Sequence, residues 1–310
     1  MQITNEIKQR VVDALTAEQA KIGKGSNEYA TYIENMLQIP FNKSAYSQIK
    51  QPKGYAAIKD ATWLKLAKYF NCLVLSDWQT AKTNTYISVQ TALELCRENG
   101  LWQVLCDIAG IGKSYAANEY AQANKGSVIY VDCSDCQSKS EFILELARQL
   151  GIEHTSTYNR LWRDVTDELL LIEKPLLILD EFGDVAESVI TLLKGLYNKA
   201  DMGDKMALGV YFIGADNLKK RLTDGRKKGK QSYAEFWSRF DNKITTLNFN
   251  ARPDAFRLEL RNEIEKIVDI NLPAELADKR EIIIEKCLMA GGVRSVRKEI
   301  ALQRKIKSIS

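Results

Sequence analysis

The sequence Trp102-Gln-Val-Leu-Cys-Asp-Ile-Ala-Gly-Ile-Gly-Lys-Ser114 joins a short apolar run to a glycine-rich turn that ends on Lys-Ser. A helix-forming stretch, residues 114–123, follows directly. This order of strand, glycine-rich turn and helix is typical of a phosphate-binding loop, because glycine lets backbone N–H groups approach a polyphosphate and a helix N-terminus favours an anion. The alternative for this turn alone is an ordinary connection between a strand and a helix.

The residues of the turn have distinct expected roles. Lys113 would place a positive charge beside the β- and γ-phosphates, and the hydroxyl of Ser114 can coordinate Mg²⁺. Asp107 stands where the usual motif begins with glycine, so its carboxylate must point away from the phosphates or weaken binding. The predicted nucleotide-binding residues of this turn are Ala109, Gly110, Ile111, Gly112, Lys113 and Ser114.

A second stretch, Pro175-Leu-Leu-Ile-Leu-Asp-Glu-Phe-Gly-Asp184, supports nucleotide binding. Its apolar run predicts a strand that is buried on both faces, which is typical of a parallel sheet. Two adjacent carboxylates at the end of such a strand suit phosphoryl transfer: Asp180 would hold Mg²⁺, and Glu181 would polarise the attacking water. A surface Asp-Glu pair explains this stretch alone, but it does not explain both stretches together.

The composition limits the classes of protein that need consideration. The chain has 310 residues, 45% of them hydrophobic and 27% charged, which is typical of a globular protein. The net charge is only +4, so binding to nucleic acid would depend on local clusters of charge. The absence of a long apolar run and of a signal-peptide pattern predicts a cytoplasmic protein with no membrane partner. The spacing of Cys133 and Cys136 resembles that of metal ligands, but there is no second cysteine pair and His154 is the one histidine, so zinc is not favoured.

Residues 1–75 show helical periodicity without a convincing strand. Ser26 is expected to cap a second helix, and Asn42 or Ser44 a third helix over residues 45–50. Two helices joined by a short turn predict a helix-turn-helix, whose second helix can enter the major groove of DNA. The candidate DNA-binding residues on that helix are Tyr46, Gln48 and Lys50. A small helical module that docks a protein is the alternative.

The remainder of the chain divides by its pattern. Residues 76–86 are polar and predict a linker, followed by a helix over 89–99. Residues 87–251 alternate between strand and helix signals, which indicates an α/β core with a parallel sheet, and residues 252–310 predict a helical lid. The strands expected after the first are residues 127–133, 176–182, 208–214 and 243–249. The helices expected with them are residues 139–150, 158–173, 187–200, 233–240, 253–268, 274–289 and 295–307.

Further polar residues fall where a nucleotide-hydrolysing site needs them. The segment 214–217 ends the fourth strand, so Asn217 or Asp216 could orient the hydrolytic water, or else one of the two caps a helix. Arg239 suits a phosphate-directed arginine finger, because its planar guanidinium binds bidentately and stays charged. Arg294 could reach the γ-phosphate from the lid. A basic loop could contact DNA phosphates or be merely solvated; its residues are Arg226, Lys227, Lys228 and Lys230.

Over residues 85–310 these motifs resemble those of AAA+ ATPases. The matching segments are 107–114 (Walker A, apart from its first residue), 176–181 (Walker B), 214–217 (sensor 1), 238–240 (arginine-finger box) and 291–294 (sensor 2). A small N-terminal helix-turn-helix region before a compact AAA+ module is similar to the phage Mu B family of transposition proteins. That resemblance implies an ATP- and Mg²⁺-dependent protein that forms oligomers or filaments on duplex DNA, selects a transposition target and activates a partner transposase. Hydrolysis, stimulated by DNA, would then drive disassembly.

Two other functions are compatible with the same motifs. One is a helicase loader or an insertion-sequence helper ATPase, which would deliver a different partner. The other is a nucleotide-dependent binding switch that hydrolyses ATP only weakly. Asp107 favours the switch, whereas the intact pair Asp180 and Glu181 argues against it.

Overall fold

The computed structural model describes residues 3–70, 72–73, 78–153, 157–201, 208–247 and 253–308. A parallel sheet forms its centre, with strands β1 (Trp102–Cys106), β2 (Val128–Asp132), β3 (Leu176–Asp180), β4 (Gly209–Gly214) and β5 (Ile244–Thr245). The strand order is β2-β3-β4-β1-β5, and every neighbouring pair is parallel. The carboxyl ends of β1, β3 and β4 therefore lie at one edge, which is where open parallel sheets bind ligands.

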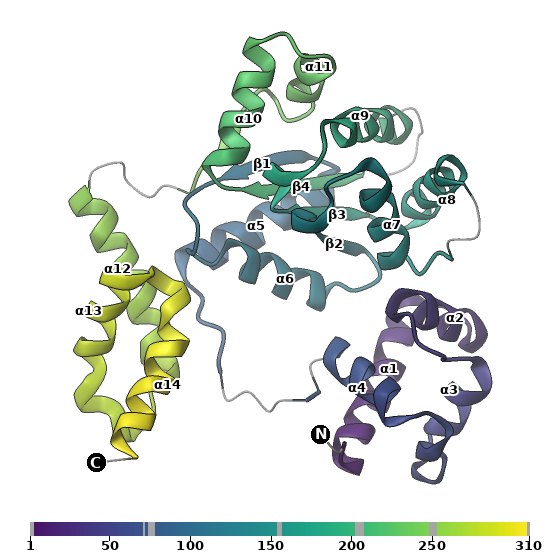
Figure 1. The fold of residues 1–310 in the computed structure, drawn as a ribbon, viewed down its shortest axis with the longest axis horizontal. Coiled ribbons are helices and arrows are strands. Elements are labelled where there is room, and N and C mark those ends of the chain that lie inside the picture. Colours follow the sequence, from purple (N-terminus) through teal and green to yellow (C-terminus); the bar gives the residue numbers. More distant parts are fainter. Residues whose placement is uncertain are drawn as a thin grey trace.

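Helices cover both faces of this sheet (Figure 1). One face packs against α5 (Asn84–Asn99) and α6 (Lys113–Ala123), and the other packs against α7 (Lys139–Gln149), α8 (Tyr158–Leu171), α9 (Glu187–Asp201), α10 (Asp216–Lys227) and α11 (Tyr233–Ser238). Alternation along the strands explains both contacts: Leu176 and Ile178 of β3 face α5 and α6, whereas Leu177 and Leu179 face the other layer. The strand is apolar throughout because neither face meets water.

The N-terminal helices share a hydrophobic core of their own. They are α1 (Asn5–Ile22), α2 (Ser26–Leu37), α3 (Lys43–Ile49) and α4 (Asp60–Tyr69), with a 3₁₀ helix, η1 (Pro52–Ala57), between the last two. Asn42 caps α3 by accepting from the N–H of Ala45 at 2.9 Å, as predicted. The prediction that Ser26 caps α2 is wrong, because Gly25 holds the cap position and Ser26 is the first helical residue.

The N-terminal helices dock onto the central core through a buried carboxylate. Glu18, which is 4% exposed, accepts hydrogen bonds from the hydroxyls of Tyr29 at 2.7 Å and Tyr69 at 2.8 Å. Lys125, just beyond the end of α6, forms an ion pair with Glu18 at 3.4 Å and lies 3.7 Å from the Tyr69 ring centroid. Burial lowers the pKa of Lys125, while Glu18 opposes that shift. A buried charge of this kind is tolerated because it is paired and hydrogen-bonded.

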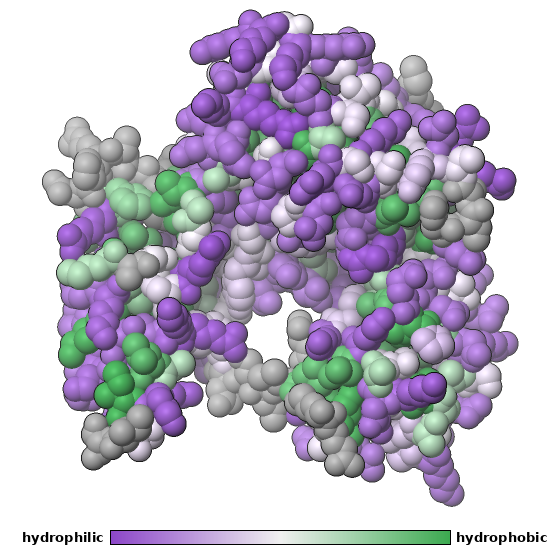
Figure 2. Space-filling model, viewed as in Figure 1, coloured by the Kyte–Doolittle hydropathy of each residue, from purple (hydrophilic) through white to green (hydrophobic). Residues whose placement is uncertain are grey.

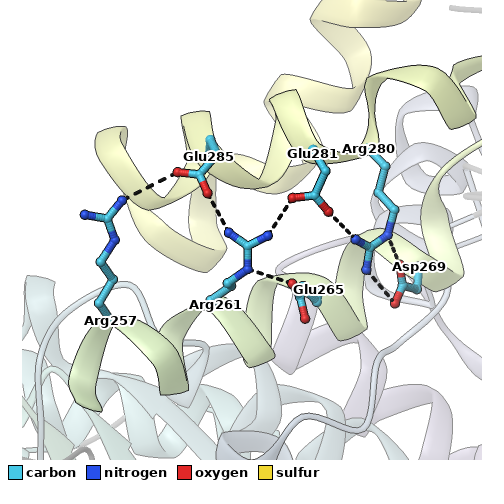
Figure 3. A network of polar contacts seen from close by, with 7 residues as sticks. All are labelled: Arg257, Arg261, Glu265, Asp269, Arg280, Glu281 and Glu285. Atoms are coloured by element: carbon cyan, nitrogen blue, oxygen red, sulfur yellow. Dashed lines mark hydrogen bonds and ion pairs between the residues drawn. The ribbon is translucent and has the colours of Figure 1, made fainter. Parts of the chain in front are cut away.

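The C-terminal helices are α12 (Pro253–Asn271), α13 (Arg280–Ala290) and α14 (Val296–Lys307), with 3₁₀ turns η4 (Ala274–Lys279) and η5 (Gly292–Ser295). An ion-pair network joins α12 to α13 (Figure 3). At its centre the Arg261 guanidinium contacts Glu265 at 2.8 Å, Glu281 at 2.5 Å and Glu285 at 2.5 Å. A single exposed ion pair contributes little to the free energy of folding. Arg261 shares its guanidinium among carboxylates of both helices, so the network restricts how α12 packs on α13.

The segment before α5 attaches these C-terminal helices to the core. Glu263 of α12, 1% exposed, accepts from the N–H groups of Asn84 at 2.7 Å and Thr85 at 3.3 Å. The side chain of Asn271 pairs with both the N–H and the carbonyl of Gln79, at 2.7 and 2.9 Å. Residues 84–86 are therefore the first turn of α5, so the predicted linker over 76–86 extends too far and the predicted helix start at 89 is late.

Two further differences from the predicted elements concern the segment after β4. The structure forms α10 over residues 216–227, where the sequence indicated only a helix cap at Asn217 or Asp216 as one alternative and no helix range, and the predicted basic loop therefore begins inside a helix. The expected fifth strand over 243–249 is reduced to two residues, while residues 248–250 lie outside the described residues. No helix among the described residues is long and apolar enough to cross a membrane.

Candidate nucleotide-binding site

The glycine-rich turn lies between β1 and α6 at the carboxyl edge of the sheet. Gly112 caps α6 with a φ of 101°, a conformation that L side chains rarely adopt, and a Cβ built there meets nothing within 4 Å. The cap residue Gly112 has no side chain that could accept from the first turn of α6, and the cavity adjoins that turn, so its N–H groups can receive an anion. The backbone thus has the conformation that a phosphate-binding loop requires.

Lys113 is 7% exposed, and its ammonium donates to the carbonyls of Asp107 at 2.8 Å and Ile108 at 2.7 Å. Burial lowers the pKa of Lys113, whereas the carboxylates of Asp107, Asp180 and Glu181 oppose that shift. A buried ammonium held only by carbonyls gains strongly from a phosphate, because charge-assisted hydrogen bonds are the stronger kind.

Asp107 does not line the cavity that the glycine-rich turn opens onto, which agrees with the expectation that its carboxylate avoids the phosphates. Its oxygens accept from the N–H groups of Ile108 and Leu247, each at 2.8 Å. Leu247 follows β5, so this carboxylate ties the glycine-rich turn to the chain beyond the last strand. The aspartate at position 107, where the usual motif has glycine, therefore has a structural role.

Asp180 and Glu181 follow β3 beside Lys113. Asp180 is 2% exposed, while Glu181 opens onto the cavity with a φ of 49°. Burial, followed by repulsion from Asp180 and Asp184, raises the pKa of Glu181. A carboxylate with a raised pKa at the mouth of a site is a better proton acceptor, as a general base needs to be.

These residues line one cavity of about 360 Å³. Its polar wall consists of the glycine-rich turn, Asp180 and Glu181, with Arg294 and Arg297 from the lid. The volume lies in the range of small-molecule sites. The predicted residues that the cavity brings together are Ala109, Gly110, Ile111, Gly112, Lys113, Ser114, Asp180, Glu181 and Arg294.

The sequence analysis missed the apolar wall of this cavity. Trp78 and Tyr86 line it from the segment before β1, and Ile213, Ile267 and Val293 line it from β4 and the lid. The guanidinium carbon of Arg297 lies 5.7 Å from the ring centroid of Trp78. An apolar wall opposite a phosphate-binding loop suits a nucleotide base. In the sequence, only the aromatic residues of 78–86 could have indicated a base-binding wall. The other residues of that wall are far apart in the sequence and come together only in the folded protein.

Two predicted catalytic residues lie outside the cavity lining. The amide of Asn217 donates to Asp184 at 3.1 Å, and neither Asn217 nor Asp216 caps α10, because the cap residue is Ala215. Arg239 donates to Asn198 at 2.8 Å and stacks 4.0 Å from the Tyr197 ring centroid. The roles of Asn217 in water orientation and of Arg239 as a finger remain predictions.

The prediction that Tyr46 contacts DNA is wrong. Tyr46 is fully buried: its ring lies 5.5 Å from that of Tyr29, and its hydroxyl donates to Gln19 at 2.8 Å. Gln48 and Lys50 are exposed on α3, with the Lys50 ammonium 4.4 Å from the Tyr46 ring centroid. The period of α3 explains the difference, since a helix of seven residues turns every third or fourth side chain toward the core.

The basic residues after β4 lie on the hydrophilic surface over α10 and α11 (Figure 2). Arg226 and Lys227 belong to α10, so only Lys228 and Lys230 belong to the connection. The Arg226 guanidinium lies 5.0 Å from the Trp237 ring centroid, and Lys230 pairs with Glu187. All four basic residues are exposed, and among the described residues Lys227 and Lys228 have neither an ion-pair partner nor an aromatic ring beneath them.

The raised pKa of Glu181 has a consequence for stability. Between its usual value and the raised one, the folded protein binds more protons than the unfolded chain, so stability falls as pH rises through that window. Glu181→Gln is expected to raise the Tm of the nucleotide-free protein at pH 7–8 and to change it little near pH 4. The increase is small because the side chain reaches solvent. Thermal unfolding across pH checks this result.

Glu187→Gln is the matched control, because its hydrogen bond with Lys230 lowers the pKa of Glu187. Removing that carboxylate should leave the Tm unchanged or lower it at pH 7–8. A Tm for Glu181→Gln at or below that of the unmodified protein at pH 8 would contradict the expected repulsion.

This chain is similar to known proteins in two respects: one segment matches a domain family, and a longer segment aligns with two phage proteins. A family model described as an AAA domain matches residues 101–222. The chain is 23% identical over 194 residues to the "ATP-dependent target DNA activator B" of Escherichia phage D108 and equally to that of Escherichia phage Mu. Those alignments cover 61% of this chain and 60% of each relative, so the chain spans about 60% of the length of these curated relatives.

A solved structure of NtrX from Brucella abortus in complex with ATP is also similar, at 13% identity and a TM-score of 0.41, over 84% of this chain and 59% of that chain. That degree of likeness carries no argument about function. The matched AAA domain covers the glycine-rich turn and the carboxylates of β3, which the structure brings to one cavity. Residues 101–222 therefore match an AAA domain, and the chain is similar to the target DNA activators B of phages D108 and Mu.

Proposed function

We propose that this protein is a DNA-stimulated ATPase that assembles on duplex DNA, marks a target for transposition and activates a partner transposase. The observation that carries the proposal is the cavity in which Lys113, Asp180, Glu181 and Arg294 meet. The relatives named as ATP-dependent target DNA activators support a role on DNA, and the resemblance to the Mu B family of transposition proteins supports the transposase as partner. Hydrolysis would release the protein from DNA.

The cavity residues fit ATP with Mg²⁺. The N–H groups of the glycine-rich turn and Lys113 would bind the phosphates, and the apolar wall would hold the base. Ser114 and Asp180 supply the oxygen ligands that Mg²⁺ prefers, and the bound ion would neutralise charge on the phosphates. Glu181 would accept a proton from the attacking water, and Arg294 would bind the γ-phosphate from the lid.

The contacts of Asp107 weaken the argument for a switch that barely hydrolyses ATP. That alternative depended on a carboxylate facing the phosphates, and both oxygens of Asp107 accept backbone N–H groups instead. No contact of the described residues favours a helicase loader over a target activator. The partner must therefore be identified by experiment.

The proposal is tested by measuring ATP hydrolysis and duplex binding with the full chain. Duplex DNA should raise the hydrolysis rate, and retention on DNA should be stronger with ATP than with ADP. Negative-stain microscopy should show assemblies on DNA only with ATP. Hydrolysis that responds to a hexameric helicase and not to DNA would favour a loader, and ATP binding without hydrolysis would favour a switch.

The surface lysines Lys227 and Lys228 provide a direct test of DNA contact. Their replacement by serine should weaken duplex binding and reduce the slope of log K against log salt by about 1.8, at roughly 0.9 for each lost phosphate contact. Lys298→Ser with Lys305→Ser on α14 removes the same charge elsewhere and should leave the slope unchanged. Equal slopes for the two double variants would mean that Lys227 and Lys228 are only solvated. Titrations of labelled duplex at several salt concentrations measure these slopes.

A further inference from the structure

A tyrosine from the neighbouring strand holds the carboxylate of Asp180. The hydroxyl of Tyr130, on β2, donates to Oδ2 of Asp180 at 2.6 Å. The other oxygen, Oδ1, accepts from the N–H of Glu181 at 2.9 Å. Each oxygen of this buried carboxylate therefore has one fixed donor, which leaves its remaining lone pairs in defined directions.

The sheet explains how Tyr130 reaches Asp180. In the register of β2 with β3, Tyr130 lies opposite Ile178, and Asp132 lies opposite Asp180. Residues two apart on a strand share a face, so the ring of Tyr130 lies on the same face as Asp180 and extends along the strand toward it. The contact thus depends on a long side chain with a terminal donor at position 130.

Tyr130 also lies on the side of β3 from which α6 approaches. Together with Ser114, Tyr115 and Asn118 it lines a second cavity of about 260 Å³. Ser114, whose hydroxyl is expected to coordinate Mg²⁺, and Tyr115 line both this cavity and the nucleotide cavity, so the two cavities adjoin at these residues. Lys113 does not hold Asp180, because its ammonium donates to the carbonyls of Asp107 and Ile108.

We propose that Tyr130 is a positioning residue for the divalent cation: its hydroxyl fixes the Asp180 carboxylate so that the ion can be shared with Ser114. The inference rests on the proposed ATP site. Tyr130 touches neither nucleotide nor ion in this assignment, and it acts only through Asp180. Its removal should therefore weaken the dependence on Mg²⁺ without weakening the binding of metal-free nucleotide.

Tyr130→Phe keeps the ring and removes only the donor. A fluorescent ATP analogue should bind this variant as tightly as the unmodified protein in EDTA. The Mg²⁺ concentration that gives half of the metal-dependent gain in affinity should rise about tenfold, since a hydrogen bond to a charged group contributes roughly 1.5 kcal/mol or more. The kcat should fall while the KM measured at saturating Mg²⁺ changes little.

Tyr120→Phe is the matched control. Tyr120 of α6 packs against the same face of the sheet, and its hydroxyl donates to the carboxylate of Glu94 at 2.5 Å, away from the cavity residues. The Tyr120→Phe variant should lower the Tm at least as much as Tyr130→Phe does, without changing the Mg²⁺ dependence of nucleotide binding. In an Asp180→Asn background, Tyr130→Phe should have no further effect on that response.

The outcomes separate this inference from the proposed function. If the unmodified protein binds no nucleotide in either condition, the proposed function itself fails. If it binds nucleotide with Mg²⁺ and Tyr130→Phe has the same Mg²⁺ dependence, only the role of Tyr130 is overturned. A variant that unfolds, or that loses far more ligand-free stability than Tyr120→Phe, would assign Tyr130 to the folding core and overturn its positioning role.

Discussion

Lys113→Ala is expected to reduce ATP affinity by roughly 100-fold or more and to abolish hydrolysis. Hydrogen bonds to charged groups contribute about 1.5–3 kcal/mol each, and the ammonium would serve two phosphates. Arg294 and Arg297 line the same cavity, but they belong to η5 and α14, so neither side chain is held at the first turn of α6 as the Lys113 ammonium is. Equilibrium binding of a fluorescent ATP analogue and a phosphate-release assay measure the two losses.

Lys139→Ala is the matched control for this variant. Lys139 is also the first residue of a helix that follows a strand, but it is exposed and lies outside the cavity. Its replacement should leave affinity and hydrolysis unchanged. ATP affinity retained by Lys113→Ala, in a protein with a normal Tm, would mean that the glycine-rich turn is not the phosphate site.

Arg239→Ala is expected to bind ATP almost normally and to hydrolyse it about 10³-fold more slowly. Arg239 is partly exposed and lies outside the cavity of its own chain, and its Nε atom has no hydrogen-bond partner among the described residues. A finger that serves a neighbouring protomer would have such a place. ATP binding, hydrolysis on DNA and assembly are measured side by side with those of Arg163→Ala, an exposed arginine of α8.

Mixing two inactive variants tests whether Arg239 acts between protomers. Lys113→Ala protomers keep the finger but not the site, whereas Arg239→Ala protomers keep the site but not the finger. Combined on DNA, some interfaces would join an intact site to an intact finger, so part of the hydrolysis should return. Co-assembly without recovery would confine Arg239 to its contacts with Tyr197 and Asn198.

The sequence predicted the parallel sheet and the phosphate-binding loop because both depend on local patterns. An apolar run such as 176–179 fits only a strand buried on both faces, and the spacing of Gly110, Gly112 and Lys113 fits few other turns. These two stretches account for the polar wall of the cavity apart from Arg294, which segment 291–294 indicated, and Arg297, which was not predicted. Its apolar wall did not, because Trp78, Ile213 and Val293 meet only once the lid has packed.

The failures have physical causes as well. Tyr46 carries a polar group on a helix beside lysines, which suggested a surface residue, but its ring fills the core between Tyr29 and Phe41. The helix α10 was missed because charged residues and Gly225 obscure its periodicity, although Leu218 and Leu222 mark its buried face. In both cases tertiary packing decided what the local pattern left open.

The helix α6 connects the phosphate-binding loop to the contact with the N-terminal helices. It begins at Lys113, in the phosphate-binding loop, and Lys125, two residues beyond its end at Ala123, is paired with Glu18. A helix of 11 residues is about 16 Å long and resists bending, so a tilt imposed at its first turn displaces its last turn as well. We therefore expect nucleotide in the loop to shift the N-terminal helices through Lys125 and Glu18, and a fluorophore pair placed on α1 and α8 would measure that shift.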